Sequence, residues 1–176
     1  MTAIQLMKAA RHWFWIAPIV LGLVFVGGGA YMIREGRAAH DEIRDTLLTE
    51  DVTTSADASI PGVKVDSAAT AKSEAEAIAG HVNKITGGKT YTQLAKDDPN
   101  RPTVLNSITL RTSLNMAVMG FNVSDLVVGL GLFMIVIGAT HILFLAPAVY
   151  WAAEVAKDHE KPVVKKTSPA TGGQTA

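Results

Sequence analysis

The sequence predicts an all-α membrane protein with two transmembrane helices and a mainly helical module outside the bilayer. Residues 13–33 contain no ionisable side chain, and residues 126–153 contain a single one, His141. Each run reaches the roughly 20 helical residues that cross a hydrocarbon core. Residues 34–125 carry most of the charges and show apolar spacings typical of helices, so they form the outer module.

Composition excludes several classes of function. The 176-residue chain has 16 Lys and Arg against 16 Asp and Glu, so it lacks the basic surface of a general nucleic-acid binder. It has no cysteine, which excludes disulfides, thiolate metal sites, iron–sulfur clusters and cysteine catalysis. The mean hydropathy of +0.24 is high for a soluble domain.

The first apolar run is predicted to be an uncleaved signal anchor. Lys8 and Arg11 precede it, but its 21 residues exceed the roughly 7–15 of a cleaved signal peptide's apolar region. Basic residues on both tails, and tryptophans at the adjoining ends of both spans, indicate that both termini are cytoplasmic. Residues 1–12 and 154–176 are then cytoplasmic tails, the second of them disordered, and residues 34–125 lie outside.

The first span is expected to continue outward as a helix. Ala39, Ile43 and Leu47 form one apolar stripe, and Gly36 is a weak point within it. Residues 51–67 alternate Val and Thr around a Pro-Gly turn, which allows a short strand pair.

Two further helices are expected in the module. Asp66 is the expected N-cap of a helix over residues 67–85, which ends at the glycines after Thr86. Its apolar face consists of Ala71, Ala75, Ile78, Val82 and Ile85. Pro102 fits the first turn of the last helix, which runs into the membrane and projects outward over residues 103–125. In that projection the residues expected to pack are Leu105, Ile108, Leu114, Val118 and Phe121.

Small residues follow one face of the last helix and recur in the first span. They are Ser113, Ala117, Gly120, Ser124, Val127, Gly131 and Gly138, together with Gly22 and Gly29 in the first span. In lipid, small residues let helix backbones approach closely. These positions are therefore predicted helix-packing sites, either between the two spans of one chain or against another subunit.

Polar residues within or beside the second span are candidate site residues. His141 lies about 10 residues from Trp151, near mid-membrane, where an ionisable side chain is a functional candidate. It could bind haem or another metal cofactor axially or hydrogen-bond a partner subunit; the simpler interpretation is a neutral histidine bonded to a neighbouring helix or a backbone carbonyl. A second face, near the outer edge of the membrane, carries Asn115, Asn122 and Asp125. These residues could form a small-molecule or ion site, or they could bond a neighbouring helix or lie among lipid headgroups.

Two other patterns resemble ligand sites. His40 and His81 could form a surface metal site with Asp41 or Glu42, but no metal-binding spacing supports this, and solvated histidines are the simpler interpretation. Residues 87–90, Gly-Gly-Lys-Thr, resemble the end of a phosphate loop without its first glycine, so they are interpreted as a helix end.

Two stretches resemble a known group of proteins. Residues 81–101 (HVNKITGGKTYTQLAKDDPNR) and 110–132 (LRTSLNMAVMGFNVSDLVVGLGL) are similar to a family of small actinobacterial membrane proteins without an assigned activity. Some members carry the name aromatic ring-opening dioxygenase. The resemblance implies a bacterial plasma-membrane protein with an N-terminal span, an outer segment and a second span.

The chemistry in that name does not fit this sequence. A ring-opening dioxygenase holds non-haem iron with two histidines and one carboxylate. The predicted topology places His40 and His81 outside, His141 in the membrane and the other two histidines inside, so three cannot meet. We therefore expect no catalytic residues, no metal site and no enzyme.

The expected function is that of a non-catalytic accessory subunit of a larger integral-membrane complex, respiratory or oxidoreductase in kind. Small-residue faces, the outer module and the absence of catalytic motifs favour it. The alternative is a stand-alone sensor or adaptor whose outer module binds a ligand or envelope component. The expected partners are other membrane subunits and lipids, with no nucleic acid and no cofactor beyond the option at His141.

Overall fold

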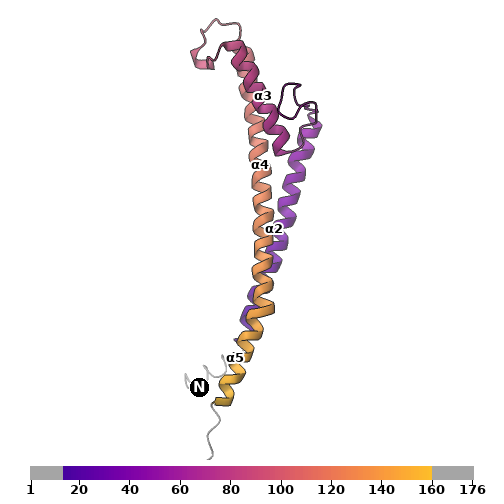
Figure 1. The fold of residues 1–176 in the computed structure, drawn as a ribbon, viewed down its shortest axis with the longest axis vertical. Helices are drawn as coiled ribbons and strands as arrows, with labels where there is room; N and C mark the ends of the chain where they lie inside the picture. Colours follow the sequence, from indigo (N-terminus) through magenta and orange to yellow (C-terminus); the bar gives the residue numbers. More distant parts are fainter. Residues whose placement is uncertain (1–13, 160–176) are drawn as a thin grey trace, which may run out of the picture. The chain divides into compact units, whose positions relative to one another are not determined.

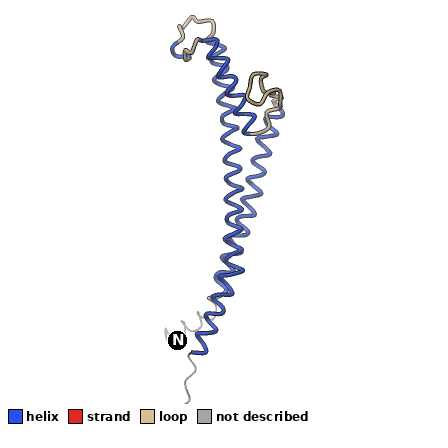
Figure 2. The backbone as a smooth tube through the Cα atoms, viewed as in Figure 1, coloured by secondary structure: helices blue, strands red, loops and turns tan. Residues whose placement is uncertain are grey.

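The computed structural model describes residues 14–159, and this part of the chain consists of helices and loops (Figures 1 and 2). The elements in order are α2 (Ile16–Thr49), α3 (Ala68–Thr86), the 3₁₀ turn η1 (Tyr91–Gln93), α4 (Arg101–Thr140), the π-helical turn η2 (His141–Leu145) and α5 (Ala146–His159). Pro102 lies in the first turn of α4, as predicted.

Two helical stretches are long and apolar enough to cross a membrane, Ile16–Thr49 and Arg101–Val155. The predicted all-α class with two candidate spans is therefore confirmed. α2 begins at Ile16 rather than at residue 13, and α5 continues through His159 into the segment expected to be a disordered tail. The tail predicted over residues 1–12, and the second tail beyond His159, lie outside the described residues.

Contacts divide the described residues into two compact units. Among the described residues, one unit contains residues 14–24 and 138–159. The other, Phe25–Ile137, contains most of α2, all of α3 and most of α4.

A π-helical turn interrupts the expected uniform second span. Pro147 has no N–H to donate to the carbonyl of Leu143, and its ring crowds that carbonyl. One residue earlier, the Ala146 N–H donates to the carbonyl of His141, five residues back. A local π turn of this kind accommodates the proline without ending the helix.

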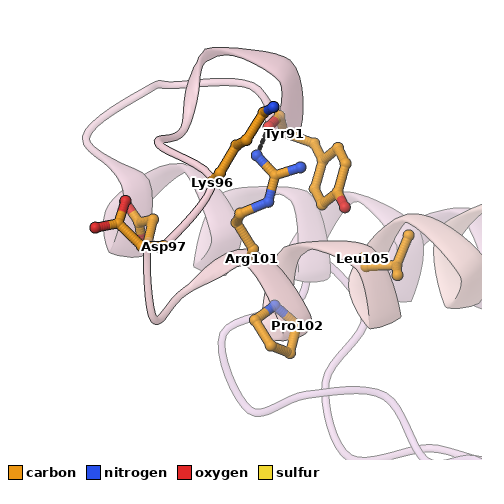
Figure 3. Close-up of a pocket in the computed structure, with 7 residues that line it drawn as sticks. Tyr91, Lys96, Asp97, Arg101, Pro102 and Leu105 are labelled. Atoms are coloured by element: carbon orange, nitrogen blue, oxygen red, sulfur yellow. Dashed lines mark hydrogen bonds between the residues drawn. The ribbon is translucent and has the colours of Figure 1, made fainter.

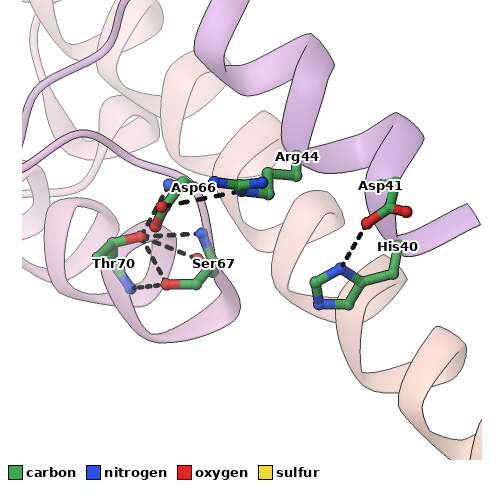
Figure 4. A network of polar contacts seen from close by, with 6 residues as sticks. All are labelled: His40, Asp41, Arg44, Asp66, Ser67 and Thr70. Carbon is green, nitrogen blue, oxygen red and sulfur yellow. Dashed lines mark hydrogen bonds and ion pairs between the residues drawn. The ribbon is translucent and has the colours of Figure 1, made fainter. Parts of the chain in front are cut away.

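The start of α3 is capped by Ser67, so the prediction of Asp66 was wrong by one residue. Ser67 Oγ accepts from the Thr70 N–H at 3.4 Å, and Thr70 Oγ1 accepts from the Ser67 N–H at 3.1 Å, which forms a capping box. The Asp66 carboxylate instead lies 3.9 Å from Arg44 Nε of α2 (Figure 4). This ion pair joins the start of α3 to α2.

α3 ends at Gly87, as predicted. Gly87 has φ 59° and Gly88 has φ 85°, conformations that favour glycine. The N–H groups of both residues donate to the carbonyl of Asn83. Residues 87–90 therefore begin as a helix C-cap.

The predicted strand pair is reduced to one antiparallel bridge between Thr53 and Lys64. Side chains of α3 accept hydrogen bonds from backbone N–H groups that a longer pair of strands would use between its strands. Glu74, only 7% exposed, accepts from the Ser55 N–H at 2.6 Å and from Ser55 Oγ at 2.9 Å. Ser73 Oγ accepts from the Ile60 N–H at 2.8 Å. The loop is therefore held against α3.

The core lies where α3 meets α4 and the end of α2. Its buried residues are Val65, Ala71, Ala75, Ile78 and Leu114, with Leu47, Val52 and Val118 packed against them. Leu114 and Phe121 are buried, as expected. Leu105 is 50% exposed, Ile108 41% and Ile85 49%, so their predicted packing was wrong.

The inward stripe of α2 also differs from the prediction. Ala39 is exposed, whereas Gly36 is buried and His40 is half-buried beside Ile43 and Leu47. The His40 ring contacts the Phe121 ring edge-on, with centroids 4.8 Å apart. The stripe therefore includes the glycine and the histidine.

Candidate functional site

A close backbone contact between α2 and α4 is the main feature of unit Phe25–Ile137. A Cβ added to Gly131 would lie 2.6 Å from the carbonyl oxygen of Gly29 and 2.8 Å from Ile33 Cγ1. Seven residues along α2, a Cβ on Gly36 would lie 3.0 Å from the carbonyl oxygen of Ser124. A real Cβ does not fit 2.6 Å from a backbone oxygen, so glycine is required at position 131, and at position 36 a Cβ would be tight against the Ser124 carbonyl.

The other unit contains a contact of the same kind. A Cβ on Gly22 would lie 2.7 Å from the carbonyl oxygen of Gly138 and 2.6 Å from Ile142 Cγ1. Both glycines are buried. Small residues thus recur every seven positions on α2 at 22, 29 and 36, and on α4 at 124, 131 and 138.

The remaining predicted packing residues differ in their contacts and burial. Gly120 faces Ile43, whose Cδ1 would lie 2.7 Å from an added Cβ, and Ser124 Oγ donates to the Gly120 carbonyl at 2.8 Å. Ala117 and Val127 are half-buried, whereas Ser113 is exposed. The small-residue face is thus occupied within the chain over most of its length.

Gly36 was missed as a packing residue. It was expected to be a weak point of the helix, although it lies seven residues after Gly29. That spacing, matched by Ser124, Gly131 and Gly138 on α4, is the signal that could have identified it.

His141 opens the π turn and is half-buried. The His141 carbonyl accepts a hydrogen bond from the N–H of Ala146, five residues later. This backbone hydrogen bond of the π turn is what distinguishes the position of His141. In the same unit, Trp15 and Tyr150 form an edge-on ring pair with centroids 6.0 Å apart.

The three polar residues predicted at the membrane edge, Asn115, Asn122 and Asp125, have different surroundings. Asn115 and Asn122 are exposed on α4 and line no described cavity. Asp125 lines a cavity of about 300 Å³ with Arg37, His40 and Asp41. The charged groups that line this cavity are of both signs. Within it, His40 Nδ1 lies 3.9 Å from Asp41 Oδ1 (Figure 4).

His40 and His81, which were predicted to lie outside the membrane, have different partners. His81 Nε2 lies 2.8 Å from Asp57 Oδ1, and Lys84 Nζ lies 3.6 Å from the other carboxylate oxygen. The bond with His81 holds the pKa of Asp57 below its ordinary value. Within residues 14–159, no three His, Asp or Glu side chains gather as a metal-binding group.

The loop before α4 is closed by Arg101. Its guanidinium carbon lies 4.1 Å from the centre of the Tyr91 ring, and Nη1 donates to the carbonyls of Tyr91 at 3.3 Å and Leu94 at 3.0 Å (Figure 3). Tyr91 and Arg101 line a cavity of about 330 Å³, together with Lys96 and Asp97. Because the guanidinium already contacts the loop itself, we interpret these contacts as structural: they hold the loop closed.

A larger groove lies between the C-terminal end of α2 and residues 110–117 of α4, with a volume of about 540 Å³. Its apolar lining consists of Ile43, Leu47, Val52, Leu110, Leu114 and Ala117. Two carboxylates, Glu42 and Glu50, also line it. Neither makes an ion pair in the part of the chain that the structure describes. The groove therefore combines an apolar floor with unneutralised negative charge.

Comparison of the chain with protein-family models, curated proteins and solved structures finds no match. The interpretation of function accordingly depends on the contacts and cavities described above. Of these, the groove offers the largest apolar surface that the chain does not cover itself.

Proposed function

We propose that this protein is a non-catalytic accessory subunit of a larger integral-membrane complex, and that the groove between α2 and α4 receives a partner subunit. The observation that carries the proposal is the groove's apolar lining, which includes Leu110 and Ile43. The alternative, a stand-alone sensor or adaptor, is distinguished by the experiment below.

The proposal depends on where the bilayer lies. Trp15 and Tyr150 have the amphipathic rings that concentrate at membrane–water interfaces. About 20 helical residues from that level reach the neighbourhood of Gly36 on α2 and of Leu130 on α4, five residues from Asp125. Charged side chains reappear at these levels, with Arg34, Arg37 and Asp125. In this proposal, α3 and the adjoining parts of α2 and α4 are therefore extracytoplasmic.

Apolar surface facing water favours coverage by a partner. On the outer part of α4, Leu105, Ile108, Leu110, Met116 and Met119 are between 41% and 63% exposed. Of these five residues, Leu110 lines the groove, and covering its side chain with a partner would be favourable. The glycine face does not offer a comparable site, since contacts such as Gly29 with Gly131 already occupy it.

Charge indicates the chemistry of the partner. Glu42 and Glu50 border an apolar floor, so the groove fits a helical segment with apolar side chains flanked by Lys or Arg. Such charges would neutralise carboxylates that have no cationic neighbour within the described chain. Complementary charge contributes to specificity, while the apolar contact supplies affinity.

The test is purification of the full chain from its native membrane in a mild neutral detergent, followed by mass spectrometry. Leu110→Glu places a charge in the groove, and Asn106→Glu places the same charge at an exposed α4 position outside it. We expect stoichiometric membrane subunits with the natural chain and with Asn106→Glu. Recovery with Leu110→Glu should fall about tenfold or more, as for a central interface residue.

Two results would contradict the proposal. A homogeneous monomer or homodimer in mild detergent would favour the sensor or adaptor instead. Equal recovery of partners with Leu110→Glu and Asn106→Glu would remove the groove as the docking site. Thermal unfolding of both variants checks that each is folded.

A further inference from the structure

A separate cavity of about 240 Å³ lies where the end of α3 and the following loop face α4. Two basic residues, Lys89 and Arg111, line it, and no acidic residue does. Neither makes an ion pair among residues 14–159. The cavity is therefore cationic, unlike the mixed-charge cavity at Asp125.

Arg111 provides the second observation. Its Nε is buried and has no hydrogen-bond partner, the single side-chain atom with this property in the described chain. Buried polar atoms are almost always paired, so the chain leaves the hydrogen-bonding capacity of this guanidinium partly unused. Nε itself is enclosed, and a ligand would meet the accessible part of the half-buried Arg111 side chain that lines the cavity. A cationic donor makes its strongest hydrogen bonds to anionic oxygen.

The backbone at the end of α3 brings the second cation to the cavity. The positive φ angles of Gly87 and Gly88 turn the chain, and Lys89 follows directly. The exposed carbonyls of a helix end disfavour anions, but here the carbonyls of Asn83 and Thr86 accept backbone N–H groups of residues 87–89. The Gly-Gly-Lys-Thr segment thus ends α3 and also supplies a positive charge.

The rest of the lining is apolar on one side. Val82 is half-buried, Val104 is 3% exposed and Ile108 is 41% exposed, and all three line the cavity. An inorganic ion would leave this wall in contact with water. A molecule with an anionic head and a short apolar part would use both surfaces.

We propose that this cavity binds the oxyanion head of a small amphiphilic molecule, a phosphate monoester or a carboxylate. Arg111 donates to the oxyanion from inside the cavity, and Lys89 adds charge beside it. The apolar part of the ligand lies against Val82, Val104 and Ile108. This site is distinct from the groove proposed for a partner subunit and does not depend on it.

The binding test uses the full chain in a neutral maltoside detergent, with ligand affinity measured by titration calorimetry and thermal shift. The probes are hexyl phosphate, hexanoate, inorganic phosphate and uncharged hexanol. We expect hexyl phosphate or hexanoate to bind at least tenfold more tightly than inorganic phosphate, and hexanol not to bind. Whichever six-carbon anion binds more tightly identifies the head group. Binding of inorganic phosphate as tight as that of both six-carbon anions would contradict a role for the apolar wall.

Arg111→Met and Lys72→Met form the matched pair of variants. Lys72 is exposed on α3 and faces Glu76 at 3.9 Å, so its loss should leave affinity unchanged. Arg111→Met should weaken anion binding about tenfold or more, because a charge-assisted hydrogen bond is lost. Arg111→Lys should retain part of the affinity.

Stability without ligand gives a second readout. Removing a buried donor that has no partner should leave thermal stability unchanged or raise it, so Arg111→Met should stay folded while losing the ligand. The proposal is overturned if none of the anions binds the natural chain, or if Arg111→Met binds them equally well. Strong destabilisation by Arg111→Met without ligand would assign Arg111 a structural role instead.

Discussion

Gly29 of α2 and Gly131 of α4 face each other so closely that neither position has room for a side chain. A Cβ on Gly131 would lie 2.6 Å from the Gly29 carbonyl oxygen and 3.0 Å from the Ile33 nitrogen. Backbone atoms cannot move aside as a flexible side chain would. The contact therefore fixes both the distance and the register of the two helices.

Gly131→Ala is expected to destabilise the protein by about 1–3 kcal/mol, the range for overpacking a close contact. Gly129, two residues earlier on α4, is the matched control, because a Cβ there would have no neighbour within 4 Å. Gly129→Ala should be neutral or stabilise by up to about 1 kcal/mol, from helix propensity. Thermal unfolding in detergent measures both, and equal effects of the two substitutions would rule out the close contact.

The topology can be tested directly, because the chain has no native cysteine. A membrane-impermeant thiol reagent should label Ala56→Cys in intact cells, since Ala56 is an exposed residue of the loop between α2 and α3. Ser168→Cys, in the C-terminal tail, should be labelled only after lysis. The opposite pattern would invert the proposed orientation.

Acid should weaken the contact between the α2–α3 loop and α3. The hydrogen bond with His81 is the largest cause that lowers the pKa of Asp57 below its ordinary value of 3.8, and Lys84 lowers it further. A depressed carboxyl pKa stabilises the fold above the unfolded value, and this contribution is lost as the pH falls through the folded value. The melting temperature of Asp57→Asn should therefore lie below that of the natural chain at pH 6. The difference should shrink below pH 3.8, and a difference independent of pH would contradict this linkage.

Glu74 should matter more to stability than its neighbour Glu76. The Glu74 carboxylate is 7% exposed and accepts two hydrogen bonds from Ser55, so Glu74→Ala leaves a part-buried N–H without its acceptor. The expected loss is about 1.5–3 kcal/mol. Glu76→Ala removes an exposed carboxylate 3.9 Å from Lys72 and should change stability by less than about 0.5 kcal/mol. Denaturant titration of both variants would separate them, and similar losses would refute the role given to Glu74.

The elements that follow from local chemistry were predictable from sequence. Uncharged runs predicted the two helices long and apolar enough to cross a membrane, the glycines after Thr86 predicted the end of α3, and Pro102 predicted the start of α4. Each depends on residues within one turn or one run, so no knowledge of tertiary contacts was needed. The π turn also has a local cause in Pro147, but proline permits either a kink or a bulge.

Features that depend on register could not be predicted in the same way. Gly36 is buried because the antiparallel pairing brings it to the carbonyl of Ser124, and no local pattern specifies that pairing. Ile135 likewise meets α2 through this pairing, since its Cγ1 would lie 2.8 Å from a Cβ on Gly29. Arg111 and Lys89 are 22 residues apart in sequence and line one cavity only because α3 folds back on α4.

The last prediction concerns the ring-opening chemistry attached to the resembling family. Iron in such enzymes needs two histidines and a carboxylate converging on one point, with open positions for oxygen and substrate. Here His81 is bonded to Asp57, whereas His40 lies beside Asp41 and packs on Phe121, so each has a different local partner. The isolated chain should therefore contain no stoichiometric iron after purification and should not cleave catechol. Elemental analysis and an oxygen-uptake assay check this, with His40→Ala and His81→Ala as companions. One iron per chain, lost in either variant, would overturn the accessory-subunit proposal in favour of an enzyme.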